Sequence, residues 1–563
     1  MKRPRSILLD LLPVVAVIVS SMPFIILGFP DGHDSIFGLV RVAEFKSSLV
    51  NGQFPPYWGN NLYGGYGSPI FLFYAPLYLF VSAICSVLAG SIADGMILAV
   101  IIFSLVAVFG AKLMLQEALG EHTFDTRAAS RVAAYFFILN PYLLGDIFLR
   151  NAFSEYAALC ISPSAVYGLL SIRHRPLVGG LILATSLALI ILAHNITALV
   201  ITPLTLATAF VLYPLPGSQS SWRMVISNIG LGLGLAAFFW IPAIYYVPLV
   251  RSDLLVAGFG DFHKNFQSLG YFFGHYEFFS TGLLTPLVIM FVACSLLFAR
   301  KKTGLPSRNL LVFAFACSLL FLFLQTRASA WVWATVPYMP YFQFPWRMMG
   351  PLALVTSILA GLSFAHLCRG KPRKIIVFRE LLFLLLCVLD AIPHLNAARP
   401  LPNQILGELS FILNPENIKN FALSATYSDE YLPRFADPNG WRSERPKVGP
   451  IIRAIPPVEV KVVEDTGTKV ILETNTEIPA RLQLGRWFFP GWTCTLNGEV
   501  HELQSTSIGS LELSVPASLN RIVLELRPPL LRRMTLWVSL VSLGGWFVML
   551  LLTLRKKNMG SGL

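Results

Sequence analysis

Long apolar runs constrain the fold of this chain more than any other feature. A transmembrane helix needs about 20 predominantly apolar residues, and runs of that kind recur from the N-terminal region to the C-terminal region. Hydrophobic residues make up 55% of the 563 residues, and charged residues make up 13%, whereas soluble domains contain about 25% charged residues. The mean hydropathy is +0.64. The sequence therefore predicts a polytopic α-helical membrane protein.

The net charge of +13 could also indicate a nucleic-acid-binding protein. Most of the basic residues, however, lie in short loops between apolar runs, and the cytoplasmic loops of membrane proteins are rich in Lys and Arg. We therefore expect no nucleic-acid partner. Six of the seven cysteines lie in apolar runs and Cys494 stands alone in a polar region, so no disulfide framework is expected.

The same basic residues predict the topology. If the N-terminus is cytoplasmic and the apolar run 70–88 does not cross the bilayer, the clusters at 173–175, 300–308, 369–374 and 555–557 all face the cytoplasm. If that run does cross, giving 13 spans, the internal clusters face outward. We expect the first alternative, with an interfacial or re-entrant helix at 70–88. The 12 expected spans are 6–28, 95–117, 128–146, 154–172, 176–193, 196–214, 223–247, 281–299, 308–325, 347–367, 374–393 and 534–554.

The residues from about 396 to 530 have a different pattern. Alternating runs such as VEVKVVED, TKVILETN and RIVLELR predict strands. Asn497-Gly498 within TLNGEV suits the type I′ turn of a β-hairpin. We expect a small extracytoplasmic β-sandwich at 396–530. It would lie between a transmembrane domain at 1–395 and a C-terminal transmembrane helix with a basic tail at 531–563.

A charged stretch, FPDGHDSIFGLVRVAEF, follows the first predicted span. Asp34 can be the N-cap of a helix at 35–50, and Arg41, seven positions on, shares its face of that helix. The opposite face is apolar, which suits a helix lying in the membrane interface. Asp34 therefore has two interpretations, either as an N-cap alone or as an acid that faces a cavity at headgroup depth together with Arg41.

The stretch NGQFPPYWGNNLYGGYGSP has aromatic and amide side chains that suit either an interfacial belt or a sugar-binding loop. In NPYLLGDIFLRNAFSEY, Asp146 and Arg150 can form an intrahelical ion pair. Ionisable groups near the bilayer are also candidates for function.

Two further polar interruptions lie at predicted outer ends of spans. In LAHNITALV, His194 and Asn195 interrupt an apolar run, and either a structural or a binding role is open. In FPWR, Arg347 falls in the first turn of a predicted helix, where a cation is electrostatically unfavourable. A nearby anion is therefore expected, either a carboxylate of the protein or a phosphate.

Taken in order, the motifs GHD, FPPYW…NN…GGYGSP, NPYLLGDIFLRNAFSEY, HNITAL and FPWR resemble a bacterial membrane family. That family is named for a region related to 6-pyruvoyl-tetrahydropterin synthase, a name that does not imply pterin chemistry. More broadly, the chain resembles GT-C-type glycosyltransferases that use polyprenyl-phosphate donors. The resemblance covers most of the chain and is strongest over 29–195 and 340–350. It implies a GT-C-like fold and a location in the bacterial inner (cytoplasmic) membrane.

In GT-C enzymes an acid of the first outer loop serves the acceptor, and acids of the second outer loop assist. By this resemblance Asp34 is the expected catalytic group, with Asp31 as its rival, and Asp146 and Glu155 match the second role. The second loop lacks a paired DxD or DxE motif. The metal ligands are therefore unknown, the use of a divalent cation stays open, and no other cofactor is expected.

The expected function is that of an inverting glycosyltransferase that moves a sugar from a polyprenyl-phosphate donor to an extracytoplasmic glycan, lipid or protein. Membrane lipids would be further partners. The expected substrate-binding residues are His33, Arg41, Tyr57, Trp58, Asn60, Asn61, Tyr66, Arg150, His194, Asn195 and Arg347. Two alternatives are a transporter or flippase for a lipid-linked glycan, which should show two pseudo-symmetric halves, and a non-catalytic assembly protein that displays the β-domain.

Overall fold

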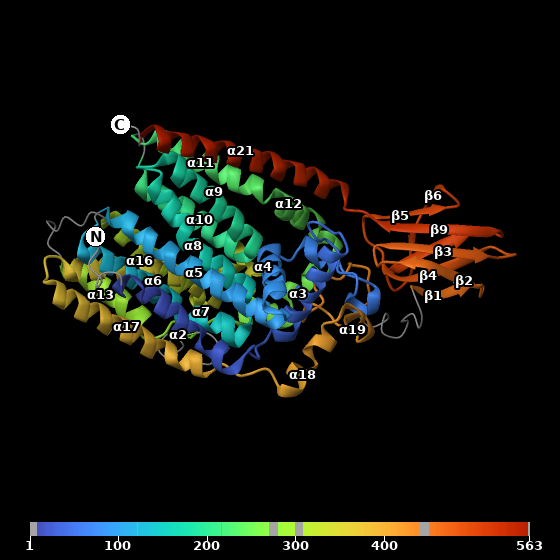
Figure 1. The fold of residues 1–563 in the computed structure, drawn as a ribbon, viewed down its shortest axis with the longest axis horizontal. Helices are drawn as coiled ribbons and strands as arrows, with labels where there is room; N and C mark the ends of the chain where they lie inside the picture. The colour runs from blue at the N-terminus through green and yellow to red at the C-terminus, as the bar shows by residue number, and fades with distance from the viewer. Residues whose placement is uncertain are drawn as a thin grey trace.

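The computed structural model describes residues 8–120, 122–214, 217–268, 280–298, 308–437 and 450–560. These residues form an elongated molecule with a large helical body and two β-sheets at one end (Figure 1). The basic residues 300–302, which belong to the cluster at 300–308 that we expect in the cytoplasm, lie outside the described residues.

Every predicted span coincides with a helix or with a bent pair of helices. Seven described helices are long and apolar enough to cross a membrane, or eight if the pair α11–α12, bent by 70°, counts as one span. The helices at the predicted spans are α2 (Leu12–Leu27), α5 (Ile92–Leu119), α6 (Phe124–Ile138), α8 (Phe153–Ser171), α9 (Pro176–Ala193), α10 (Asn195–Leu212), α11 (Gln219–Leu235) with α12 (Ala237–Tyr246), α13 (Leu284–Phe298), α14 (Arg308–Gln325), α16 (Met349–Cys368), α17 (Arg373–Asn396) and α21 (Leu530–Gly560). The predicted polytopic helical class is confirmed.

Helices α8 and α9 approach closely because glycines lie at their contact. A Cβ atom on Gly168 would lie 2.5 Å from the backbone nitrogen of Leu183, and one on Gly179 would lie 2.5 Å from that of Ile172. Lipid supplies no hydrophobic force between helices, so membrane helices rely on small residues for close packing. This packing fixes α8, which carries one of the candidate acids at its N-terminal end.

The two predicted interfacial segments are both helical. Helix α3 spans Ser35–Val50, as predicted, and lies near the end of the helical body that faces the sheets (Figure 1). The run 70–88 begins with a 3-10 turn and continues as α4 (Pro76–Ala89). With 14 residues, α4 is about 21 Å long, which is short of the roughly 30 Å hydrocarbon core. Its length does not decide whether this segment crosses, because α2 and α13, with 16 and 15 residues, are similarly short. The alternative in which it does not cross stays a prediction.

The β-domain consists of two antiparallel sheets. One has the order β1-β4-β8-β7, and the other has the order β2-β3-β9-β5-β6. Apolar side chains such as Leu472, Leu482 and Ile522 form a buried core in this domain. The strands are β1 (Ile451–Ile455), β2 (Val460–Asp465), β3 (Lys469–Asn475), β4 (Ala480–Trp487), β5 (Trp492–Leu496), β6 (Glu499–His501), β7 (Gln504–Ser505), β8 (Ser510–Val515) and β9 (Leu519–Leu526). A β-domain is thereby confirmed, but its described strands begin at Ile451. The first part of the predicted range 396–530 contains two helices, α18 (Asn403–Ile412) and α19 (Pro415–Asn420).

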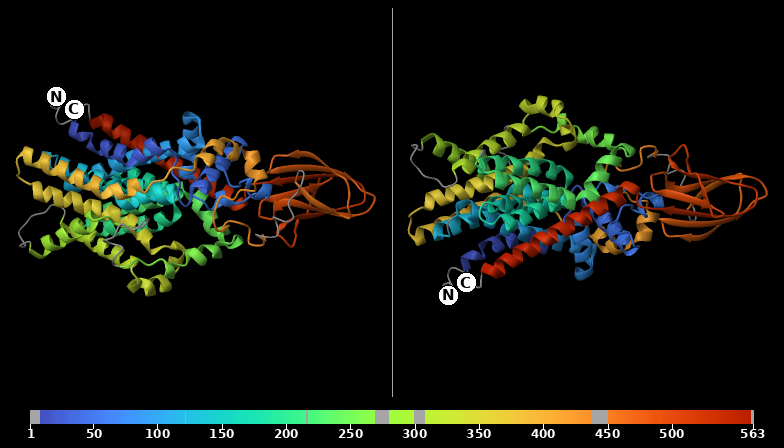
Figure 2. Two further views of the ribbon diagram at one scale, coloured as in Figure 1. Left: turned by 90° about the horizontal axis from the view of Figure 1, so that it is seen from below. Right: turned by 90° about the horizontal axis from the view of Figure 1, so that it is seen from above.

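The turn between β5 and β6 has the backbone that the sequence predicts. Asn497 and Gly498 have φ angles of 53° and 92°, as a type I′ turn requires at both central positions. After β9, helix α21 runs back along the helical body and ends far from the sheets, as Figures 1 and 2 show.

Candidate functional site

The loop that carries His33 and Asp34 lies directly against the second charged motif. The backbone N–H of His33 donates to the carbonyl of Leu149 at 3.1 Å, and that of Asp34 donates to the carbonyl of Arg150 at 3.0 Å. The approach is close, since a Cβ atom on Gly32 would lie 2.8 Å from the carbonyl oxygen of Leu149. Two motifs that are far apart in the sequence therefore share one place in the fold.

An irregular backbone positions the second motif. Helix α7 (Pro141–Gly145) continues into a π-helical turn, η3 (Asp146–Arg150), and Asn151 then adopts a left-handed conformation with a φ of 55°. Asn is among the residues that tolerate this region of φ/ψ space, and isolated π-helical turns frequently occur at functional sites. The turn separates α7 from α8.

Arg150 is the centre of a buried charge cluster. Its guanidinium forms an ion pair with Asp146 and lies 3.1 Å from Glu155 Oε2. The Tyr142 hydroxyl donates to Glu155 Oε1 at 2.5 Å, and the Arg150 guanidinium lies 4.3 Å from the centroid of the Trp346 ring. Buried charges are costly unless they are paired. Arg150 therefore forms ion pairs with two buried carboxylates.

Arg347 is the second arginine of the cluster. Its Nε atom lies 3.3 Å from Glu155 Oε2, and its Nη1 atom donates to the Phe342 carbonyl at 2.9 Å and to Gln343 Oε1 at 3.0 Å. The Nε atom has no partner in hydrogen-bonding geometry among the described residues, but its ion pair with Glu155 occupies it. An external anion at Arg347 would therefore compete with Glu155.

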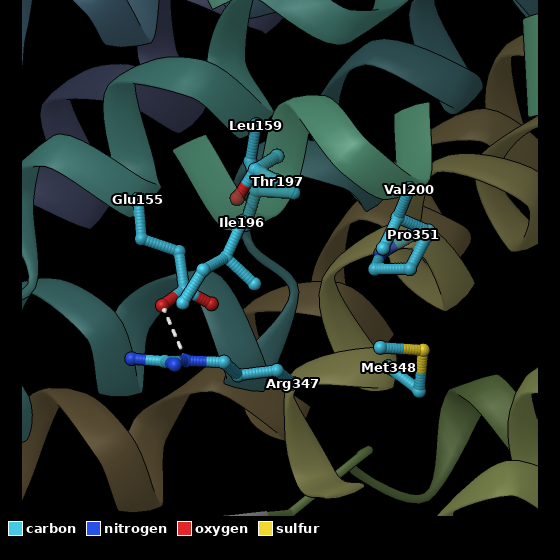
Figure 3. Close-up of a pocket in the computed structure, with 8 residues that line it drawn as sticks. All are labelled: Glu155, Leu159, Ile196, Thr197, Val200, Arg347, Met348 and Pro351. Atoms are coloured by element: carbon cyan, nitrogen blue, oxygen red, sulfur yellow. Dashed lines mark ion pairs between the residues drawn. The ribbon is translucent and has the colours of Figure 1, made fainter. Parts of the chain in front are cut away.

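A small pocket lies beside Glu155 and Arg347. Its lining residues come from α8, α10, the turn before α16 and α16 itself, and they are Glu155, Leu159, Ile196, Thr197, Val200, Arg347, Met348 and Pro351. Figure 3 shows the charged pair on one side, with Val200, Met348 and Pro351 on the other. The lining therefore places a cation beside apolar side chains.

His194 and Asn195 lie at the start of α10, next to this pocket. The Nδ1 atom of His194 accepts from the backbone N–H of Thr197 at 3.3 Å, and a neutral imidazole then carries its proton on Nε2. Asn195 Nδ2 donates to the Phe73 carbonyl at 3.0 Å. Neither residue lines the pocket itself, although Thr197 connects His194 to its wall.

Asp34 is a partly exposed carboxylate of this region. It occupies the N-cap position of α3, as predicted, but its side chain makes no capping hydrogen bond, so capping does not occupy the carboxylate. Its carboxylate is 44% exposed and lies 3.7 Å from Arg41 Nη2. Arg41 is buried, donates to the Ala425 carbonyl at 2.7 Å, and lies 4.5 Å from the centroid of the Tyr74 ring.

Asp31, the rival of Asp34, lies in a different environment. Its backbone N–H donates to the carbonyl of Arg399 at 2.8 Å, next to a bridge between Pro30 and Pro400. The residue is exposed, and no ion pair within the described ranges connects its carboxylate to the cluster. Asp31 therefore anchors the loop through its backbone.

The predicted sugar-binding aromatic residues contact the β-domain instead. The Tyr57 hydroxyl donates to the Leu526 carbonyl at 2.8 Å, and burial raises the pKa of Tyr57 to about 12, so this donor keeps its proton. The rings of Trp58 and Tyr66 pack against those of Phe489 and Trp487, with centroid separations of 5.9 and 4.6 Å. These contacts dock the two parts of the molecule together.

The two predicted amides are likewise occupied by protein. Asn60 Nδ2 donates to the Thr466 carbonyl at 3.5 Å. The backbone and side-chain N–H groups of Asn61 donate to the two carboxylate oxygens of Glu44, each at 2.9 Å. The structure therefore gives this loop a docking role, and its contact with a sugar stays a prediction.

Sequence reasoning missed four residues of this region: Tyr142, Trp346, Glu430 and Tyr431. The first two lie within the quoted motifs, but aromatic residues in a membrane chain are too common to stand out. Glu430 and Tyr431 follow the last span of the body in a stretch with no periodic pattern. The Tyr431 ring stacks on that of Phe73, with centroids 5.6 Å apart and an interplanar angle of 2°. No local signal could have brought these residues to the site.

Among the described residues, no group of three or more His, Cys, Asp or Glu side chains could hold a metal ion. The carboxylates near the site are instead close to arginines. The chemistry that the arrangement supports directly is anion binding by arginine and proton transfer at a partly exposed carboxylate.

Comparisons with known proteins give distant similarities. No protein-family model matches the chain, so the resemblance to the family related to 6-pyruvoyl-tetrahydropterin synthase stays a prediction. The chain is 25% identical over 338 residues to an uncharacterized protein of Lactococcus lactis subsp. cremoris (strain MG1363). That match covers 56% of this chain and 53% of that protein, so the chain spans about half of its curated relative.

Similar solved structures include three membrane transferases. They are the apo oligosaccharyltransferase of Archaeoglobus fulgidus (15% identity, 76% of this chain and 61% of that chain, TM-score 0.46), the arabinofuranosyltransferase AftD from mycobacteria (15%, 72% and 29%, TM-score 0.43), and apo ArnT from Cupriavidus metallidurans (12%, 74% and 78%, TM-score 0.39). TM-scores below 0.5 do not establish a common fold.

Proposed function

We propose that this chain is a membrane glycosyltransferase that takes a sugar from a polyprenyl-phosphate donor and transfers it, with inversion, to an extracytoplasmic acceptor. One observation carries this proposal. A partly exposed carboxylate, Asp34, is held by backbone hydrogen bonds beside a buried arginine cluster, and that cluster borders a pocket with apolar walls.

The pocket suits a lipid phosphate. In this proposal the Arg347 guanidinium receives the phosphate in competition with Glu155, and the isoprenoid chain lies along Val200, Met348 and Pro351. Arginine donors bind phosphate oxygens by strong charge-assisted hydrogen bonds. Arg347 would also stabilise the negative charge that develops on the leaving phosphate in the transition state.

Asp34 is the proposed general base. It would accept the proton of an acceptor hydroxyl while that oxygen forms a bond to the anomeric carbon of the sugar. The bond from that carbon to the phosphate oxygen breaks in the same step, and attack from the opposite face inverts the configuration. General-base catalysis requires a carboxylate within hydrogen-bond reach of the hydroxyl, and the 44% exposure of Asp34 leaves room for one.

The other acids have positioning roles in this proposal. Both carboxylate oxygens of Glu155 are occupied, one by Tyr142 and the other by Arg150 and Arg347. Asp146 is fully buried and paired with Arg150. Neither acid is free to receive a proton from an acceptor, so they hold the arginines in place.

The direct test is a transfer assay. Purified full-length protein in lipid nanodiscs is incubated with several polyprenyl-phosphate sugars and with candidate acceptors, and released polyprenyl phosphate is measured by mass spectrometry. The wild-type protein should release it from at least one donor. Asp34→Asn should reduce the rate by at least about 100-fold, because general-base catalysis contributes about 10² to 10⁴.

The matched control is Asp31→Asn, which changes a neighbouring exposed acid that anchors its loop through the backbone. It should keep most of the activity. Full activity in Asp34→Asn, or equal losses in both variants, would remove Asp34 from the role of general base.

A further inference from the structure

A segment between the helical body and the β-domain, residues 425–432, crosses the candidate site, and we name it the strap. Arg41 Nη1 donates to the Ala425 carbonyl at 2.7 Å, and the Tyr63 hydroxyl donates to Asp429 Oδ1 at 2.9 Å. The backbone N–H of Arg251 donates to the Leu432 carbonyl at 3.1 Å. The strap is therefore fixed along its length rather than hanging free.

The strap presents one highly exposed aromatic ring. Tyr427 is 80% exposed, and its ring meets the edge of the Phe37 ring with centroids 6.2 Å apart and an interplanar angle of 86°. Phe37 lies in the first turn of α3, three residues after Asp34. The exposed ring therefore contacts a residue that lies one helical turn from the proposed general base.

The strap also carries a buried carboxylate with unused hydrogen-bonding capacity. Glu430 Oε2 is buried and has no hydrogen-bond partner among the described residues, and the same holds for Arg41 Nε. The charges of Arg41 and Asp34 both act on Glu430, and burial raises its pKa. Buried polar atoms without partners are rare in proteins, so a ligand with several hydroxyl groups would satisfy them here.

We propose that the strap is the binding subsite for the acceptor, and that the acceptor is a glycan; this inference rests on the proposed function. The apolar face of a sugar ring packs on the Tyr427 ring, since aromatic side chains combine a flat apolar surface with a polar edge. Glu430 and Arg41 bind its hydroxyl groups, and Asp34 faces the hydroxyl that reacts.

The test is a binding experiment that needs no donor. Full-length protein in nanodiscs is applied to an array of bacterial cell-envelope oligosaccharides, and the apparent affinity is measured for wild type, Tyr427→Ala and Glu430→Gln. Both variants should bind at least tenfold more weakly than wild type. Phe435→Ala is the matched control, because Phe435 is also an exposed aromatic residue, at 70%, outside the strap. It should bind like wild type.

The binding and transfer experiments together distinguish the glycan subsite from the proposed function. Unchanged binding in Tyr427→Ala and Glu430→Gln, or no oligosaccharide binding by a wild-type protein that transfers sugar to a peptide or lipid, would overturn the glycan subsite alone. Strap-dependent oligosaccharide binding by a protein that releases no polyprenyl phosphate would support the subsite and contradict the proposed function. Absence of both activities would overturn both.

Discussion

At the scale of single residues, the two arginines of the cluster differ in their ion-pair partners. Arg150 lies between Asp146 and Glu155 and is the only ion-pair partner of Asp146 among the described residues. Arg347 shares Glu155 with Arg150 and lines the pocket. We therefore expect removal of Arg150 to damage the fold, and removal of Arg347 to damage ligand binding.

The matched substitutions Arg150→Met and Arg347→Met test this difference. Arg150→Met leaves the buried Asp146 carboxylate unpaired, and breaking a buried ion pair costs about 3–5 kcal/mol, so the protein should unfold at a clearly lower temperature. Arg347→Met should unfold close to the wild-type temperature but lose stabilisation by added polyprenyl phosphate. Thermal unfolding with and without that lipid measures both effects. Equal destabilisation by the two substitutions would contradict the assignment.

At the scale of secondary-structure elements, two contacts position the site. The crossing of α8 and α9 at Gly168 and Gly179 holds the helix that carries Glu155. On the other side, the loop 57–66 docks the β-domain through Tyr57 and Gly65, whose carbonyl accepts from Arg486 at 2.8 Å. Within the β-domain, Arg486 is held by an ion pair with Asp465 at 2.6 Å. The site thus depends on one helix crossing and one domain contact.

Gly168→Ala tests the helix crossing. The added methyl group would meet the backbone of α9, and overpacking typically costs about 1–3 kcal/mol, so the unfolding temperature should fall. Gly230→Ala is the control, because nothing lies within 4 Å of a Cβ at that helical position. There Ala should be neutral or stabilising by up to about 1 kcal/mol. A Gly168→Ala protein as stable as Gly230→Ala would show that the crossing is not close.

Asp465→Asn tests the ion pair within the β-domain that holds Arg486 where it contacts Gly65, and the pH dependence of that pair. Burial alone would raise the pKa of Asp465, but the charge of Arg486 and its hydrogen bonds outweigh burial and lower it. Because the folded pKa lies below the unfolded value of about 3.9, this stabilisation is complete above that value and is lost as the pH falls through the folded pKa.

At neutral pH, Asp465→Asn should therefore lower the free energy of unfolding by about 3 kcal/mol, as expected for a buried ion pair that loses one partner. The difference from wild type should shrink as the pH falls below about 4. Thermal unfolding of both proteins over a pH series measures this. A difference that does not depend on pH would mean that the Asp465 charge does not matter.

At the scale of the whole molecule, the candidate site lies toward the end of the helical body that bears the β-domain. Helix α21 ends at the opposite end (Figure 1). The predicted topology puts the β-domain and the site outside the bacterial inner membrane and both chain termini in the cytoplasm. A donor in the outer leaflet could then reach the pocket.

Cysteine labelling tests this topology. In a background without the exposed Cys294, Val500→Cys in the β-domain, 90% exposed, should react with a membrane-impermeant maleimide in intact cells. His174→Cys, in the exposed turn between α8 and α9, should react only after the cells are permeabilised. Labelling of His174→Cys but not Val500→Cys in intact cells would reverse the predicted orientation.

The sequence predicts the helices well because long apolar runs leave a helix as the main way to satisfy backbone hydrogen bonds in lipid. It also identifies Asp34, Arg150 and Arg347, because charged residues stand out in such a chain. It does not predict which residues the loop 57–66 and the strap contact, since their partners lie hundreds of residues away. The contact from Tyr57 to Leu526 spans 469 residues, and no local pattern encodes it.

The most direct test of the central claim is a cryo-EM structure of the full-length protein in nanodiscs with saturating polyprenyl phosphate. We predict phosphate density within hydrogen-bond distance of the Arg347 guanidinium, with the lipid chain along Val200 and Pro351. Phosphate density at the opposite end of the helical body, or an empty pocket at saturating lipid, would contradict the claim.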